Sequence, residues 1–430
     1  MQKKVNVTGA ISQVKGTDLV ATPVANISNA LLGNTPGVSG LQTSGEPGHN
    51  DASIRIRGIS TYGSANPLIV IDGVEQPSEQ AMAELNAMDA NEIQGISVLK
   101  DASSTAVYGI RGANGVIIVT TRRGQTGAPK VNLSMNYGFT SASSLQKGTS
   151  AYEYALMRNE AIRHDQRSFS GTESLSTYIY DDYDLWKFRN NRDYTPVELD
   201  ARGDLTAAQK ELLKNQPALY YASRDLYKEM FDRVAPQMQI NLNVSGGTER
   251  VKYFVSFGYF SQQGITTDIR YYDADTGSNF NRYNFRSNFD IQVAKNFKVS
   301  VNVAGQFGKS QGLGSGSDPY DLSSRYKGIM QYIYDANPFI SPGMIDGHLI
   351  EGFAGVAGTE QNPLANKTAS TIGNQNAIVS LLRAGTNSIF NSLLDNTIKL
   401  EHTMDYLLEG LRVYGTVNYQ DNYNRIVKYT

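Results

Sequence analysis

The residues whose type and spacing most clearly suggest chemistry are two arginines in the segment SIRIRG, residues 53–58. Arg55 and Arg57 stand two positions apart, so on an extended strand both project from the same face. Guanidinium groups suit two-point contacts with carboxylates better than ammonium groups do. The spacing therefore predicts either ion pairs with nearby carboxylates, such as Asp72 and Asp101, or a strand edge whose arginines are simply solvated.

Other kinds of chemistry find little support in the composition. The chain of 430 residues has no cysteine, which excludes disulfides, thiolate metal sites and cysteine nucleophiles. Its four histidines show no ligand spacing, and no nucleophile, base and orienting group converge in the sequence. Lys and Arg number 39 against 41 Asp and Glu, without a basic run, which disfavours nucleic acid. We therefore expect no catalytic centre, no metal site, no cofactor and no nucleic-acid partner.

Aromatic residues gather in the segment that follows residue 140. Trp186, Tyr180 and Tyr183 are candidates for stacking platforms that contact sugar rings or peptide side chains. The alternative is that these rings pack a small core within that segment, and we favour this alternative, because a single sequence is weak evidence for a binding site.

The segment DADTG, residues 273–277, resembles the start of a calcium-binding loop. Asp273 and Asp275 have the right spacing, but no bidentate glutamate follows at the position such a loop requires. We interpret the segment as a turn, and weak calcium binding stays an open alternative.

The stretch 66–123 predicts a small α+β unit that positions the arginines. Residues 68–71, 93–99 and 116–121 are short runs rich in β-branched residues, which favours strands. Asp101 is a good N-cap for a helix over 102–108, with Gly109 as its left-handed end. Asp72-Gly73 and Asn114-Gly115 are pairs typical of tight turns.

The pattern changes after residue 127 to strict alternation of apolar and polar residues. Strands of about 9–11 residues with one apolar and one polar side are typical of transmembrane barrels. The polar side carries charged residues, Arg286 and Asp290 among them, which would be costly against lipid and cheap in a hydrated lumen. Seven such segments occur, at residues 131–139, 238–245, 251–259, 283–291, 299–307, 398–406 and 411–419.

The connections between these strands alternate between long and short. The long ones cover residues 140–237, 260–282 and 308–397, and each is followed by a short one. Barrels of the outer membrane have this asymmetry, with tight turns on one side and extended loops on the other, whereas a sandwich has no reason to sort its loops in this way.

Several long motifs resemble one known family. GEPGHNDASIRIRG, NPLIVIDGV, ISVLKDASSTAVYGIRGANGVIIVTT and VSGGTERVKYFVSFGYFSQQG are similar to the plug and first barrel strands of SusC/RagA-type TonB-dependent outer-membrane transporters. The resemblance implies a plug domain over residues 1–127 and the beginning of an antiparallel transmembrane β-barrel over 128–430, about seven of some 22 strands. It also favours, over a solvated edge, a position in which Arg55 and Arg57 face the inner barrel wall or bracket plug carboxylates such as Asp72 and Asp101, and it makes Arg55, Arg57, Asp72, Asp101 and Arg111 candidates for plug gating and plug–barrel contacts.

The resemblance further implies a function. Such proteins import an oligomeric nutrient, a glycan or a peptide, across the outer membrane of Gram-negative, Bacteroidetes-type cells, with the plug as the gate. The implied partners are the TonB–ExbB–ExbD complex, a SusD-like surface lipoprotein and outer-membrane lipid. Residues 1–14 contain neither a signal peptide nor the segment that contacts TonB, so we expect the chain to be part of a longer protein.

Two other classes of protein share some of these features. A siderophore or cobalamin receptor has a plug and a barrel but not the long pattern from IRIRG to IVTT. A soluble, secreted glycan-binding β-protein would also explain the aromatics and the alternation, but it would not sort its loops by length.

Overall fold

The computed structural model describes most of both regions and parts of the long connections. The described residues are 11–21, 25–42, 44–58, 65–77, 81–145, 147–168, 180, 182–190, 196–203, 206–214, 223, 225–231, 234–271, 274–275, 277–313, 331, 333–334, 344–345, 348–349 and 385–429.

The N-terminal unit contains a five-stranded sheet. Its spatial order is β1 (Ile11–Lys15), β6 (Ile93–Leu99), β7 (Val116–Thr121), β4 (Leu68–Ile71) and β5 (Val74–Glu75). β4 and β7 are parallel, and the other neighbours are antiparallel. A separate hairpin joins β2 (Val38–Gln42) to β3 (Ala52–Ile56). The unit is thus the α+β arrangement that the stretch 66–123 predicts.

Short helices surround this sheet. They are α1 (Gly16–Val20), α2 (Ile27–Leu31), α3 (Ala81–Ala87), η2 (Ala90–Glu92), α4 (Ala102–Thr105) and η3 (Ala106–Gly112). One apolar core joins them to the strands, and Leu19, Ile54, Ile69 and Leu85 are fully buried in it. The β-branched residues that favour the strands are therefore also the residues that fill the core.

The predicted turn at Asp72-Gly73 is confirmed, whereas the predicted single helix over 102–108 is not. Asp72 (φ 49°) and Gly73 (φ 89°) make the two-residue turn between β4 and β5, as predicted. The single helix expected over 102–108 is instead α4 and η3, with Gly109 at φ 57° inside the second. Asp101 occupies the N-cap of α4 without a side-chain capping bond, because its carboxylate is paired with Arg57.

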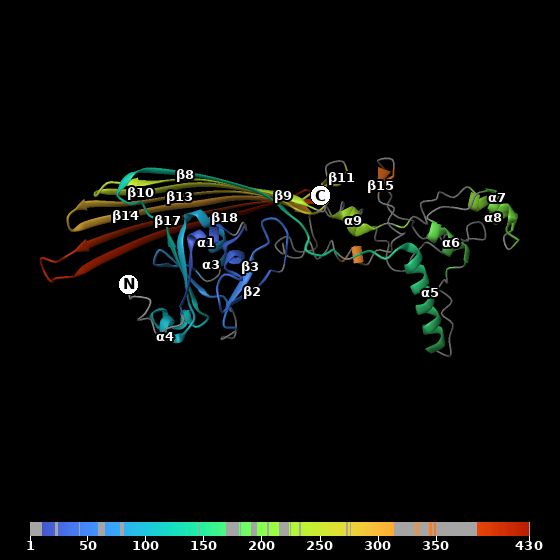
Figure 1. Ribbon diagram of the computed structural model, residues 1–430, viewed down its shortest axis with the longest axis horizontal. Helices are drawn as coiled ribbons and strands as arrows, with labels where there is room; N and C mark the ends of the chain where they lie inside the picture. Colours follow the sequence, from blue (N-terminus) through green and yellow to red (C-terminus); the bar gives the residue numbers. More distant parts are fainter. Residues whose placement is uncertain are drawn as a thin grey trace.

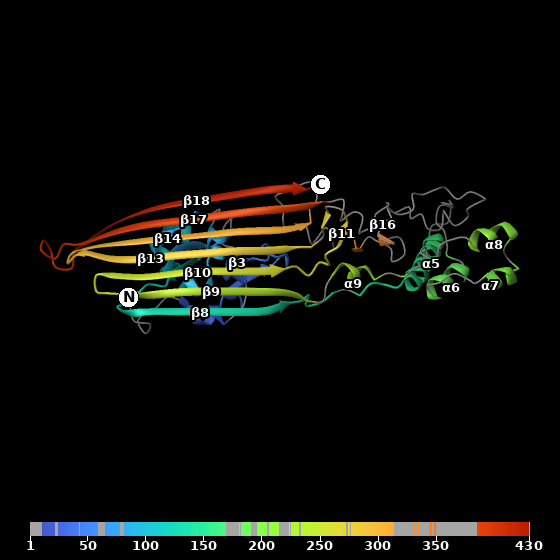
Figure 2. The same cartoon turned by 90° about the horizontal axis from the view of Figure 1, so that it is seen from above.

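The second region is a seven-stranded antiparallel sheet in which every strand pairs with its neighbour in sequence (Figure 2). The sheet lies over the N-terminal unit, with that unit on its inner side (Figure 1). Its strands are β8 (Gly127–Thr140), β9 (Ala235–Gly247), β10 (Val251–Gln263), β13 (Asn279–Ala294), β14 (Phe297–Leu313), β17 (Thr386–Thr403) and β18 (Arg412–Tyr429).

These strands are 13 to 18 residues long and therefore exceed the predicted lengths. β17 starts at Thr386 and not near residue 398, so the connection expected over 308–397 is shorter than predicted. The segment 386–397 escaped prediction because Asn387, Asn391 and Asn396 interrupt its apolar alternation. Short connections at 248–250, 295–296 and 404–411 alternate with long ones, as the sequence indicates.

The polarity of the sheet is inverted relative to a water-soluble sheet. Polar and charged side chains on the inner face are buried beneath the N-terminal unit, each 8% exposed or less: Asn241, Asn243, Ser256, Arg282, Asn284, Arg286, Asn288, Ser300 and Asn302. Large apolar side chains on the outer face are 36–50% exposed: Leu242, Val255, Phe257, Tyr283, Phe307, Phe390, Ile398 and Leu400. Hydrophobicity alone does not hold the two regions together.

The long connections contain further short elements. Between β8 and β9 lie α5 (Ala151–Ser168), α6 (Asp182–Asn190), α7 (Pro196–Ala201), α8 (Ala207–Lys214) and α9 (Leu226–Met230). The later connections contain two-residue strands, β11 (Arg270–Tyr271) with β12 (Ala274–Asp275) and β15 (Met344–Ile345) with β16 (His348–Leu349). Among the described residues, none of the helices has the length and apolar character needed to cross a membrane.

We expect Leu85→Ala to destabilise the N-terminal unit by about 2–5 kcal/mol, because the truncation leaves a cavity in the shared core. Hydrogen–deuterium exchange of the β4 and β7 amides measures the change. Val107→Ala is the matched control, since Val107 is 90% exposed and its loss should change stability by less than about 0.5 kcal/mol. Equal exchange in the two variants would contradict this assignment of the core.

Candidate functional site

The candidate site is the contact between the N-terminal unit and the inner face of the sheet. Two segments of the unit make most of this contact: residues 84–92, which cover most of α3 and η2, and residues 121–123, which follow β7. We call them together the docking segments. Their partners are the inward side chains of β9, β10, β13, β14 and β18.

At the centre of the contact is a buried ion pair between Glu92 and Arg286. Arg286 Nε lies 2.9 Å from Glu92 Oε2, and the two side chains are only 7% and 3% exposed. Ser256 Oγ donates to the other carboxylate oxygen at 3.3 Å. Burial raises the pKa of Glu92, and the Arg286 guanidinium opposes that rise. The pair therefore connects η2 to both β10 and β13.

The local fold of η2 brings Glu92 to this position. Asp89 caps the short helix by accepting from the Asn91 backbone N–H at 2.7 Å. Its other oxygen accepts from Gln239 Nε2 of β9 at 3.1 Å. One carboxylate thus fixes the turn that presents Glu92 and also bonds the sheet.

The carbonyl groups at the end of α3 find their partners on the sheet. The last carbonyls of a helix have no partner within it. Arg282 Nη1 donates to Asn86 O at 3.0 Å, and the amide of Asn284 donates to Ala87 O. Arg282 is 2% exposed, and its positive charge at the carboxyl end of the helix is electrostatically favourable.

A second network is centred on Asp72. This carboxylate accepts from the Thr121 backbone N–H at 2.9 Å and from Arg123 Nη2 at 2.9 Å. Arg123 also donates from Nη1 to Asn302 Oδ1 at 2.7 Å, and the same nitrogen lies 3.6 Å from Asp290 Oδ1. Arg123 therefore bridges the turn after β4 to strands β13 and β14.

The residues that follow β7 add contacts of their own. Asn288 Nδ2 donates to Arg122 O at 2.8 Å and to Thr121 Oγ1 at 3.0 Å. At Gly124 the chain passes so close to β10 that an added Cβ would lie 2.3 Å from Tyr253 N. A side chain larger than glycine would force the connection away from the sheet.

A carboxylate faces another carboxylate across the contact. Glu84 of α3 is buried, and both burial and the charge of Asp395 on β17 raise its pKa to about 7. The Gln420 side chain donates to Glu84 Oε2 at 3.3 Å, and the same amide donates to Gln76. Glu84 is thus a residue of the contact whose protonation changes near neutral pH.

The two arginines singled out in the sequence do not contact the wall. Arg57 instead pairs with Asp101 within the N-terminal unit, which is the other position that we expected for it. Arg55 is exposed on the β2–β3 hairpin. Arg111 Nη2 lies 2.6 Å from Glu75 Oε2 in an exposed pair. Among these candidates, Asp72 is linked to the seven-stranded sheet indirectly. Its carboxylate binds Arg123, and Arg123 contacts Asn302 and Asp290 of the sheet.

The aromatic candidates lie in the first long connection. Tyr180 is 8% exposed and packs edge-to-face on Phe188 at 5.4 Å, and Asn159 hydrogen-bonds both its N–H and its carbonyl. This is the geometry of a packing residue. Trp186 is half-buried on α6, and Tyr183 belongs to α6 but its side chain lies outside the described residues.

The calcium candidate falls largely outside the described residues: Asp273 is not among them, and of Asp275 the structure describes only its place in β12. Within the part of the chain that is described, no group of three or more His, Asp and Glu side chains could hold a metal ion.

Sequence reasoning missed Glu92, Asp89, Glu84 and Arg123 as site residues. Alternation on β13 did place Arg286 and Asp290 on the polar face, which the structure bears out. A usable signal was therefore present on one side of the contact. The carboxylates of residues 84–92 had no such signal, because a short helix followed by a 3-10 turn has no periodicity that identifies its outward face.

Comparison with known proteins gives the family. The model of the TonB-dependent Receptor Plug Domain matches residues 3–116. TonB-dependent receptor P26 of Formosa agariphila is 31% identical over 307 residues, 70% of this chain and 25% of the relative. TonB-dependent receptor SusC of Bacteroides thetaiotaomicron is 28% identical over 380 residues, 84% of this chain and 32% of SusC.

Solved structures support the same fold. A structure of the RagAB peptide importer in its open-open state superposes with a TM-score of 0.66 at 21% identity, covering 99% of this chain and 42% of that one. The chain thus spans about a quarter to a third of the length of the curated relatives it matches. Its N-terminal unit is the plug, and its seven-stranded sheet matches part of the barrel wall of these receptors. The chain belongs to the TonB-dependent receptors.

Proposed function

We propose that this chain supplies the plug and the first wall strands of an outer-membrane importer, in which the plug is the gate for an oligomeric nutrient. The observation that carries the proposal is the inverted polarity of the sheet: buried arginines and asparagines inside, exposed aliphatic and aromatic side chains outside. A sheet in water would bury the second set. In a lipid bilayer the outer set meets hydrocarbon, and the inner set meets a hydrated lumen.

The aromatic residues of the outer face support a membrane position. Phe285, Phe307, Phe390 and Tyr423 form a row across four neighbouring strands, with ring centroids 6.2–6.5 Å apart. Tyr259 and Tyr283 form a further aromatic pair on this face, with their ring centroids 5.0 Å apart. Transmembrane barrels carry such rings of aromatic side chains where hydrocarbon gives way to the polar interface.

The chemistry of the contact supports the role of the plug as a gate. The plug is held to the wall by ion pairs and by hydrogen bonds to its backbone carbonyls, among them Arg286–Glu92 and Arg282 to Asn86 O. Water can replace each of these bonds when the plug shifts, whereas separating two apolar surfaces would expose both to water. A pull on the plug from the periplasmic side can therefore rearrange it.

The expected partners and cargo follow from the family. We infer that the TonB–ExbB–ExbD complex supplies the pull and that a SusD-like lipoprotein covers the outer opening. The solved relative is described as a peptide importer, and SusC is the curated relative with the broadest coverage of this chain among those given above. We propose a glycan or a peptide as the cargo, moved across the membrane and not chemically changed by this chain.

Two adjacent positions on β18 test the orientation of the wall. Val417 is on the outer face, and Asn418 is on the inner face, where its amide donates to Asp395 Oδ1 at 2.6 Å. We expect Val417→Arg to cost about 2–4 kcal/mol in the bilayer and to lower the amount of protein that inserts into outer membranes. Asn418→Arg gains a carboxylate partner and should insert normally. Equal loss of insertion in both variants would reverse our assignment of the faces.

The Glu92–Arg286 pair tests the gate. Arg286→Met or Glu92→Leu alone leaves a buried charge without its partner, at a cost of about 3–5 kcal/mol, and should raise the passive flux of small solutes through the full-length protein in liposomes. Replacing both residues together should return the flux toward the wild-type value, because no unpaired charge remains. Arg412→Met is the control, since Arg412 pairs with Glu401 within the wall. A double variant that leaks as much as the single ones would show that this pair does not hold the plug.

The contact should also depend on pH. A Glu84 carboxyl with a pKa of about 7 in the docked plug keeps its proton where an undocked carboxyl, with its ordinary value of 4.5, has lost it. Docking is therefore strongest below pH 4.5 and weakens as the pH rises to 7. We expect the passive flux to increase over this range, and Glu84→Gln to flatten the increase. A slope in Glu84→Gln as steep as in the wild type would rule out Glu84 as the source.

A further inference from the structure

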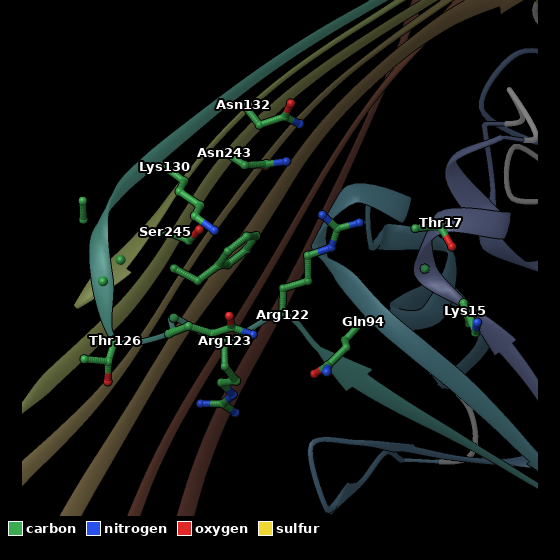
Figure 3. Close-up of a pocket in the computed structure, with 17 residues that line it drawn as sticks. Lys15, Thr17, Gln94, Arg122, Arg123, Thr126, Lys130, Asn132, Asn243 and Ser245 are labelled. Atoms are coloured by element: carbon green, nitrogen blue, oxygen red, sulfur yellow. The ribbon is translucent and has the colours of Figure 1, made fainter. Parts of the chain in front are cut away.

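A cavity of about 790 Å³ lies between the edge of the plug and the ends of β8 and β9. Figure 3 shows it between the plug edge, where Lys15, Gln94 and Arg122 lie, and strands β8 and β9. Its volume falls within the range of small-molecule sites. Arg122 and Arg123 of the docking segments form one border of it, and both also bond the wall, at Asn288 and Asn302.

The lining of the cavity is basic. Lys15, Arg122, Arg123 and Lys130 contribute to it, and no Asp or Glu is among its lining residues. Arg123 is already engaged with Asp72 and Asn302. Arg122 extends along the plug and donates from Nε to Ile93 O at 3.2 Å, and Lys130 extends from β8 on the other side of the cavity (Figure 3). An anionic group in this space would be attracted from both sides.

A buried amide in the same cavity has no partner. Asn243 of β9 is 5% exposed, and neither its Oδ1 nor its Nδ2 makes a hydrogen bond. Figure 3 shows this side chain reaching into the space beside Lys130. A buried polar group without a partner costs about 1–3 kcal/mol, so such groups usually have a ligand or water as partner. Asn243 offers both a donor and an acceptor, which matches a hydroxyl group.

The remaining lining residues fit a sugar. Asn132 and Ser245 add polar atoms, whereas Phe254 of β10 is 3% exposed and closes the lining without offering a stacking surface. Cations for an acidic group and amides for hydroxyl groups together match an acidic saccharide better than a neutral one. An acidic peptide would use the cations but would leave the amide pair of Asn243 with less to bond.

The cavity lies near the start of β8 and the end of β9, at the edge of the sheet where the short connections are. We propose that the cavity is a subsite that binds the acidic group of a saccharide as it passes between the plug and the wall. This inference rests on the proposed import function and names the chemical class of its cargo.

Isothermal titration of the full-length protein in detergent tests the subsite. The probes are an oligogalacturonate, a neutral malto-oligosaccharide of equal length, oligoglutamate and inorganic sulfate. We expect the oligogalacturonate to bind most tightly, and its affinity to fall as salt is added. Lys130→Gln and Asn243→Leu should each weaken it about tenfold or more, as expected when a hydrogen bond to a charged or buried group is lost.

Lys298→Gln is the matched control, because Lys298 is an inward-facing wall lysine that pairs with Asp290, outside the cavity. It should leave oligogalacturonate binding unchanged. Lys130 is exposed on β8, so its replacement should not disturb folding.

Three outcomes would overturn the assignment: equal binding of the acidic and neutral saccharides, tighter binding of oligoglutamate or sulfate, or binding that neither Lys130→Gln nor Asn243→Leu weakens. The titration does not depend on uptake. If cells that contain the wild-type protein fail to import any oligomer while this binding persists, the import proposal fails and the subsite remains.

Discussion

The constraint on which the rest of the structure depends is that the inner face of the sheet carries buried charges that need partners. Arg282 and Arg286 are 2% and 6% exposed, and a guanidinium cannot lose its proton to escape the cost of burial. Removing such a charge from water costs several kcal/mol unless a carboxylate or carbonyl group replaces the water. The plug supplies these groups through Glu92 and through the carbonyl of Asn86. The wall therefore requires a plug of this particular polarity.

The same constraint explains the form of residues 81–92. Leu85 and Met88 belong to the core of the plug, whereas Glu84, Asn86 and Glu92 contact the wall. A long regular helix would continue to cover its own carbonyl groups. The short α3 instead ends where Arg282 and Asn284 can reach them, and η2 then turns the chain so that Glu92 points at Arg286. This one segment therefore packs apolar side chains into the plug core on one side and presents polar groups to the charged wall on the other.

The sequence predicted the parts of this arrangement that depend on local periodicity. The alternation on β13 placed Arg286 and Asp290 on the inner face, and the Asp72-Gly73 turn formed as expected. Sequence reasoning missed contacts between residues that are distant in the chain. Glu92 and Arg286 are 194 residues apart, and no local periodicity relates them. The family resemblance left two positions open for Arg55 and Arg57, the barrel wall and the plug carboxylates, and Arg57 pairs with the plug carboxylate of Asp101.

The polar character of the contact also determines how firmly each part of the plug is held to the wall. A buried ion pair contributes little net affinity compared with an apolar surface of the same size, but it fixes which groups must meet. The plug is therefore positioned closely without being held strongly, which agrees with the gate role proposed above. The docking segments bond β9, β10, β13, β14 and β18, whereas near β8 the plug and wall are separated by a cavity lined with Arg122, Lys130 and Asn243. Among the described residues no hydrogen bond or ion pair joins the plug to β8, so a small shift of the plug would widen the cavity at that strand without breaking one there.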